Sequence, residues 1–304
     1  KGNGVNKITH DARTYLFWAA YTNNLELVNH LLKNGAKIDL RDSHGNTAML
    51  FAANAGLTNI KIYDVLLKHG VNPSSELTTN GANALLLLAP YIKDISVVDY
   101  FVDKGISIEN SDKDGYNIFH YASRSVNKIL IQHLLNIGFD ITAKAKNGGN
   151  AFLFANRGVR NKKNTIEDFK YLESLGVNPN VITNDGVNPL HYLDARSKNK
   201  IVINYFLSKG VSINQADKSG NTPFLNVSRR NDLEIVKLLF PKVKNINIKN
   251  ANGQSALSLA IQRNNARVVE FLINNGANTN VIDKQGNTLG YYLISSFSNR
   301  NRKN

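Results

Sequence analysis

Glycine recurs through this chain with a period of about 33 residues, and this period constrains the fold more than any other feature. One series of glycines follows a polar triplet and precedes an apolar stretch: Gly45, Gly81, Gly115, Gly148, Gly186, Gly220, Gly253 and Gly286. A second series keeps step with it: Gly35, Gly70, Gly105, Gly138, Gly176, Gly210 and Gly276, with Val243 in one slot where glycine is expected. A fixed period over nearly the whole chain predicts an array of stacked units.

Each unit repeats the same local signals. The run Asp217 to Gly220 has turn chemistry, because aspartate bonds its own backbone and glycine accepts a positive φ. Thr222 and Pro223 then supply an N-cap and a first-turn proline. Paired apolar residues at helical spacing follow in a second segment, as in Leu238 and Leu239. The pattern predicts a turn and two short helices in every unit.

On these signals the chain resembles the ankyrin repeat family. The matching stretches are Asp42–Ala53 (DSHGNTAMLFAA), Asp217–Phe224 (DKSGNTPF), Leu233–Leu239 (LEIVKLL), Val269–Asn280 (VEFLINNGANTN) and Asp283–Leu289 (DKQGNTL). The resemblance covers residues 9–297 and implies an all-α ankyrin-repeat solenoid of stacked antiparallel helix pairs, joined by β-turn or hairpin loops. It implies a single array with units that start near residues 9, 42, 78, 112, 145, 183, 217, 250 and 283.

The two ends are expected to depart from the array. Residues 1–8 are predicted to be a leader, and residues 298–304 a disordered basic tail. The ninth unit is expected to hold only its first helix, Leu289–Phe297. Its apolar edge consists of Leu289, Tyr292, Leu293 and Phe297. This edge is predicted to be covered by a partner or another domain, or to be a natural cap.

The residues give no support for catalysis. The 304 residues include no cysteine, which excludes disulfides, thiolate metal sites and a cysteine nucleophile. His120 and His191 occupy the same slot of their units, which favours a structural role, and the chain contains no HExxH motif. It also contains no phosphate-binding P-loop and no GxSxG motif. We therefore expect a protein that is not an enzyme and has no cofactor or metal.

Charge is distributed unevenly along the chain. Residues 1–152 hold 15 basic and 13 acidic side chains, whereas residues 153–304 hold 22 and 10. The basic second half favours an acidic partner. The apolar run Leu85–Ala89 stops at Pro90, so no membrane insertion is expected. A monomer is expected. The compartment stays open: the absence of cysteine and of an initiator methionine leans towards an exported chain, and a cytoplasmic one is not excluded.

In a repeat array, the positions that differ between units are the ones that select a partner. The two positions nine and ten residues after each glycine carry arginine six times, although the chain has only 12 arginines. These residues form a predicted concave stripe: Arg124, Arg157, Arg196, Arg229, Arg230 and Arg263. The N-terminal units place Tyr21, Asn54 and Tyr91 there instead. Guanidinium groups bind carboxylates in a bidentate manner, which favours arginine over lysine.

The leading interpretation is a non-catalytic interaction module that holds an acidic or extended protein partner in its groove. A longer loop, Arg157–Asn164, adds a basic projection with Arg160, Lys162 and Lys163. Three alternatives stay open. The basic half binds nucleic acid or another polyanion, the chain is a regulatory or targeting array of a larger protein, or the stripe is only solvated.

Overall fold

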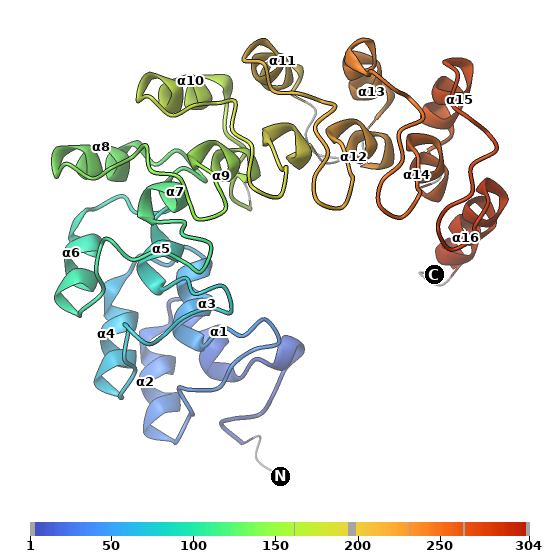
Figure 1. Ribbon diagram of the computed structural model, residues 1–304. Coiled ribbons are helices and arrows are strands. Elements are labelled where there is room, and N and C mark those ends of the chain that lie inside the picture. Colours follow the sequence, from blue (N-terminus) through green and yellow to red (C-terminus); the bar gives the residue numbers. More distant parts are fainter. Residues whose placement is uncertain (1–3, 161, 194–198, 231, 264, 302–304) are drawn as a thin grey trace. The chain divides into compact units, whose positions relative to one another are not determined.

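The chain is built from short helices joined by turns (Figure 1). The computed structural model describes residues 4–160, 162–193, 199–230, 232–263 and 265–301. The helical array predicted from the period is present, but it divides into two compact units, Lys1–Val177 and Asn178–Asn304.

The helices alternate between a first and a second helix of each repeat. In unit 1 they are η1 (His10–Ala12), α1 (Tyr15–Tyr21), α2 (Leu25–Lys33), α3 (Ala48–Asn54), α4 (Ile60–Lys68), α5 (Ala84–Leu88), α6 (Ser96–Asp103), α7 (Ile118–Ala122), α8 (Lys128–Asn136), α9 (Ala151–Arg157) and α10 (Ile166–Ser174). In unit 2 they are η2 (Pro189–Tyr192), α11 (Lys200–Ser208), α12 (Pro223–Arg230), α13 (Leu233–Leu239), η3 (Phe240–Lys242), α14 (Ala256–Gln262), α15 (Ala266–Asn274) and α16 (Leu289–Asn301). In the described residues, no helix is long and apolar enough to cross a bilayer.

Within each unit the first helices pack side by side in chain order. In unit 1, α1 contacts α3, α3 contacts α5, α5 contacts α7 and α7 contacts α9. In unit 2 the same row runs from η2 through α12 and α14 to α16. Figure 1 shows the second helices of unit 1 as a separate outer row. The small buried residues of the first helices, such as Ala52 and Ala122, leave room for this close packing.

Asparagine is the N-cap residue of nine of the described helices, which explains part of its high frequency in the sequence. The Asn83 side chain accepts from the Leu86 backbone N–H at 2.9 Å and caps α5. Before α11, Asn199 accepts from Ile201 and Val202. Because the first N–H groups of a helix have no partner inside it, such side chains supply one. The helices are five to nine residues long over most of the array, so capping matters for each of them.

The turns between repeats are linked to one another. The carboxylate of Asp42 accepts from the backbone N–H groups of His44 and Asn46 and so closes its own turn. The next residue after Asp42 donates its backbone N–H to the carbonyl of Asp11 in the preceding turn, at 2.9 Å. Lys218 repeats this bond in unit 2 by donating to the Asp185 carbonyl at 2.8 Å. Consecutive turns are therefore held in register by backbone bonds.

The structure describes residues at both predicted ends of the array. Asn6 bonds the backbone of Gly35 and Lys37, as Asn247 bonds Gly276 and Asn278, so this part of the predicted leader packs as a repeat residue. At the other end α16 continues to Asn301, four residues into the predicted tail, because no proline or glycine follows Gly290 to stop it. Residues 302–304 of that tail lie outside the described residues.

The predicted apolar edge of the ninth repeat is only partly open. Tyr292 is buried, and its hydroxyl donates to the Asp283 carboxylate. Leu293 and Phe297 are 47% and 51% exposed, together with Ile294 at 69%. The edge therefore holds one inward residue and several outward ones.

Candidate functional site

Unit 1 contains a cavity of about 720 Å³ on the side of the first helices. Trp18 and Tyr21 come from α1, whereas Phe51 and Asn54 come from α3. The remaining lining residues precede α1 or follow the ends of α3, α5, α7 and α9: Arg13, Ala55, Tyr91, Arg124, Val159, Arg160 and Lys162. We call this cavity the unit 1 pocket.

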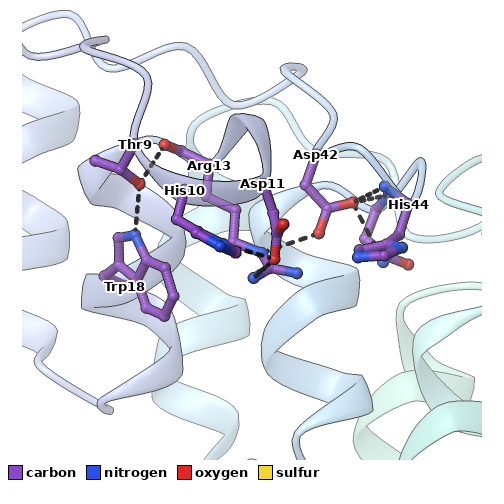
Figure 2. A network of polar contacts seen from close by, with 8 residues as sticks. Thr9, His10, Asp11, Arg13, Trp18, Asp42 and His44 are labelled. Atoms are coloured by element: carbon purple, nitrogen blue, oxygen red, sulfur yellow. Dashed lines mark hydrogen bonds and ion pairs between the residues drawn. The ribbon is translucent and has the colours of Figure 1, made fainter. Parts of the chain in front are cut away.

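Aromatic rings gather at the α1 and α3 end of the unit 1 pocket. The Tyr21 and Phe51 ring centres are 5.4 Å apart, and Trp18 meets Phe51 edge-on at 5.8 Å. The Trp18 Nε1–H donates to the Thr9 hydroxyl at 2.9 Å (Figure 2), so the indole has its hydrogen bond and its ring offers an apolar surface. Tyr21 is 41% exposed, which leaves much of its ring open to a ligand.

Arg13 is fixed within this aromatic cluster. Its guanidinium carbon lies 4.3 Å from the Phe51 ring centre and 5.6 Å from that of Trp18. Figure 2 shows its two carboxylate partners, Asp11 at 2.9 Å and the fully buried side chain of Asp42 at 3.1 Å. The positive charge of Arg13 is therefore compensated by carboxylates of the chain itself, so the aromatic end has no free positive charge for a ligand carboxylate.

The need for Arg13 follows from a difference between repeats. The buried Asp112 accepts from the Tyr121 hydroxyl of its own repeat at 2.9 Å, and Asp283 accepts from Tyr292 in the same way. The corresponding residue after Asp42 is Phe51, which has no hydroxyl. Arg13 of the preceding repeat supplies the missing donor through its Nε–H.

Cationic side chains form the other end of the unit 1 pocket. Arg124 is half-buried and donates its Nε–H to the Gly158 carbonyl at 3.4 Å, and the Lys162 ammonium donates to the Ser125 carbonyl at 3.0 Å. Arg160 is exposed. Within the described ranges none of the lining residues is acidic, and no ion pair joins these three cations to a carboxylate.

The longer loop is folded back onto the preceding repeat. Val159 and Lys162 form an antiparallel bridge, and the buried Asn164 amide donates to the carbonyls of Arg124 and Ala155 at 3.1 and 2.7 Å. These bonds place Arg160 and Lys162 in the pocket wall, where both side chains stay exposed to solvent. The loop was predicted as a basic projection, and two of its cations line the pocket.

The predicted site residues fall into three groups. Six of them line the unit 1 pocket together: Tyr21, Asn54, Tyr91, Arg124, Arg160 and Lys162. Arg157 and Lys163 do not line it: the Arg157 guanidinium lies over the Phe154 ring at 5.2 Å, and Lys163 donates to the Arg157 carbonyl.

The rest of the predicted stripe belongs to unit 2. Arg229 is half-buried in α12, and Arg263 is exposed at the end of α14. Arg230 ends α12, but its side chain lies outside the description, and Arg196 lies outside the described residues. A continuous stripe through all five repeats therefore stays a prediction.

Sequence reasoning missed Arg13, Trp18 and Phe51. Trp18 and Phe51 stand six residues after the turn position of their repeats, one helical turn before the positions that were read for the stripe. Residues three apart on a helix share a face, so reading both positions would have found the rings. Arg13 has no signal in its own repeat, because its role depends on Asp42 in the next one.

The two histidines that share a slot have structural roles. His120 and Asn117 form a reciprocal cap at the start of α7, and His191 and Asn188 do the same at η2. Burial lowers the pKa of His120 to about 4, so its ring is neutral at pH 7. In the described part of the chain, no three His, Asp or Glu side chains lie close enough to hold a metal ion.

These features agree with the comparison to known families. The family model for ankyrin repeats, three copies, matches residues 1–77, 157–250 and 224–301, which together exceed half of the chain. The chain therefore belongs to the ankyrin repeat family. Ankyrin repeats generally mediate protein–protein interactions and are generally non-catalytic.

Similar proteins come from several sources. The ankyrin repeat protein FPV031 of fowlpox virus (strain NVSL) is 30% identical over 167 residues, covering 53% of this chain and 48% of the viral protein. The variola virus ankyrin repeat protein OPG189 is 29% identical over 191 residues, covering 57% of this chain and 33% of its own. The palmitoyltransferase AKR1 of Lachancea kluyveri is 24% identical over 194 residues, which are 50% of this chain and 26% of that protein. The chain spans about half the length of these relatives, or less.

Proposed function

We propose that the unit 1 pocket binds an extended, acidic segment of a protein partner. The observation that carries this proposal is that three cations line one cavity: Arg124, Arg160 and Lys162. Among the described residues, none of the three forms an ion pair with a carboxylate. A ligand carboxylate there gains charge-assisted hydrogen bonds without displacing an existing ion pair.

The shape and charge of unit 1 favour a protein over a nucleic acid. Residues 1–177 hold 20 basic and 16 acidic side chains, so unit 1 lacks the broad excess of positive charge that a polyanion backbone requires. Four of these basic side chains line the unit 1 pocket: Arg13, Arg124, Arg160 and Lys162. Because the general role of ankyrin repeats is protein binding, an acidic peptide segment is the ligand class that fits both observations.

The test is a selection from a displayed library of random twelve-residue peptides against the purified chain. Selected peptides are then measured by fluorescence anisotropy with a triple variant, Arg124→Gln, Arg160→Gln and Lys162→Gln. The matched control, Lys33→Gln, Lys37→Gln and Lys61→Gln, removes the same charge from exposed positions outside the pocket. Circular dichroism confirms that all three proteins fold alike.

We expect enrichment of Asp and Glu and an affinity loss of at least about tenfold in the triple variant only, since tenfold corresponds to about 1.4 kcal/mol. Binding should also weaken with added salt, because the pocket is open to solvent on one side. Peptides without acidic enrichment, or equal binding by both variants, would contradict the proposal. Tighter binding of a thymidine oligonucleotide than of every selected peptide would favour the polyanion alternative instead.

A further inference from the structure

The two ends of the unit 1 pocket differ in chemistry, and this difference makes the site directional. At the α1 and α3 end, the charge of Arg13 is neutralised by Asp11 and Asp42. The Trp18 indole N–H already donates to Thr9. That end therefore offers aromatic surface with few unsatisfied polar groups, which favours an apolar side chain over a carboxylate.

An aromatic side chain suits that end better than an aliphatic one. Trp18 and Phe51 meet at an angle of 82°, and Tyr21 and Phe51 are tilted by 30°, so the rings of the cluster lie at different angles to one another. An additional ring gains edge-to-face or offset contacts with such a cluster beyond the area that it buries. Tyr21 and Asn54 are exposed, so a ligand ring reaches the cluster without displacing the core.

The cationic end lies two to three repeats further along the row of first helices. Helices packed side by side are about 8–10 Å apart, so the path from α1 and α3 to the end of α7 is roughly 16–30 Å. An extended chain advances about 3.3 Å per residue, so this path corresponds to roughly five to nine residues. Tyr91 lies between the two ends and packs on Gly56.

We infer that the ligand segment is bipartite: one aromatic side chain sits against Trp18, Tyr21 and Phe51, and carboxylates roughly five to nine residues away along the segment meet Arg124, Arg160 and Lys162. This inference rests on the proposed function and adds the aromatic anchor and its spacing from the carboxylates. Aromatic and arginine anchors of this kind dominate binding free energy at protein interfaces.

The same peptide selection tests the inference separately. The expected consensus contains one aromatic residue at a fixed distance from an acidic cluster. An acidic consensus without an aromatic residue would overturn the bipartite ligand and leave the proposed function standing. A consensus with no acidic cluster, or no enrichment at all, would overturn both.

A double-mutant cycle then locates the aromatic contact. The probes are a selected peptide and its aromatic→Ala version, and the protein variants are Tyr21→Ala and the matched control Tyr291→Ala, an exposed tyrosine on α16. We expect Tyr21→Ala to weaken binding of the selected peptide about tenfold and to leave the alanine version unchanged. Equal losses for both peptides, or no loss for either, would place the aromatic residue elsewhere and overturn the inference.

The emission of Trp18, the single tryptophan of the chain, gives an independent readout of occupancy. Addition of the selected peptide should change this emission, whereas the aromatic→Ala peptide should change it much less at equal saturation. An identical change with both peptides would contradict contact between the ligand ring and this cluster.

Discussion

The Arg13 guanidinium carbon lies 4.3 Å from the centre of the Phe51 ring. The same side chain donates to the buried carboxylate of Asp42, a role that a tyrosine hydroxyl fills for Asp112 and Asp283. One residue therefore holds a structural aspartate and orders the aromatic end of the unit 1 pocket. We therefore expect stability and the proposed ligand binding to be coupled at this point.

Replacing Arg13 should destabilise unit 1. Arg13→Gln leaves Asp42 buried without its cationic partner, a change that costs about 3–5 kcal/mol when an ion pair is fully buried. Phe51→Tyr in the same chain should recover part of this loss, because the new hydroxyl is placed as in Tyr121. Urea unfolding followed by circular dichroism measures both effects. If the double variant recovers no stability, position 51 is not equivalent to the position of Tyr121 in its own repeat.

Gly56 should be more sensitive to substitution than Gly35, which shares its backbone conformation. It has a φ of +85°, and an added Cβ would lie 2.7 Å from the Tyr91 ring. Gly35 has the same φ of +85° but open space around it, so Gly35→Ala measures the backbone cost alone, roughly 1–2 kcal/mol. We expect Gly56→Ala to lose more stability and to weaken binding of the selected peptides, whereas Gly35→Ala keeps their affinity. Equal affinity of both variants for the selected peptides would show that Tyr91 does not contribute to the binding site.

Acid should weaken unit 1 through His120. Its pKa is lowered by burial from 6.5 to about 4, so the unfolded chain takes up a proton more readily than the folded one. The free energy of unfolding is therefore expected to fall as the pH drops from 6.5 towards 4, by on the order of 3 kcal/mol.

His120→Gln should flatten this dependence, because glutamine at the third helical position keeps the cap without titrating. His30→Gln, at an exposed position, is the control. Urea unfolding at several pH values checks the effect, and an unchanged slope in His120→Gln would assign the acid sensitivity to other groups.

Asn164 should anchor the wall that carries Arg160 and Lys162. Its buried amide donates to the carbonyls of Ala155, Arg124 and Ser123, at 2.7, 3.1 and 3.4 Å. Asn164→Ala is expected to cost about 1–3 kcal/mol and to weaken peptide binding, since the loop loses its tether. Asn136→Ala, at an exposed position on α8, is the matched control. Full affinity in Asn164→Ala would mean that the loop does not depend on this tether.

The sequence predicts the fold well because each repeat carries its own signals. Glycine spacing, capping asparagines and paired apolar residues all act within about 33 residues, and they specify the helices found here. The division after Val177 was not predicted. It comes just before the repeat whose first helix is reduced to the short η2, which offers less packing surface than a full α-helix.

The candidate site is predicted in part. Reading one pair of positions found Tyr21, Asn54, Tyr91 and Arg124, because those positions face the pocket in the first four repeats. The inward fold of the Arg157–Asn164 loop depends on bonds from Lys162 and Asn164 to the preceding repeat, which no local pattern reveals. Contacts between repeats therefore cannot be predicted from the sequence pattern of a single repeat.

The bond from Arg13 to Asp42 also decides how this array can be recombined. Repeats that pair Asp112 with Tyr121, or Asp283 with Tyr292, are self-sufficient cassettes, since the buried acid and its donor lie in one segment. The first two repeats divide that pair between them. We therefore expect a rearrangement that separates the first two repeats to leave Asp42 buried without this partner, so these repeats have to stay together to keep the aromatic end of the pocket.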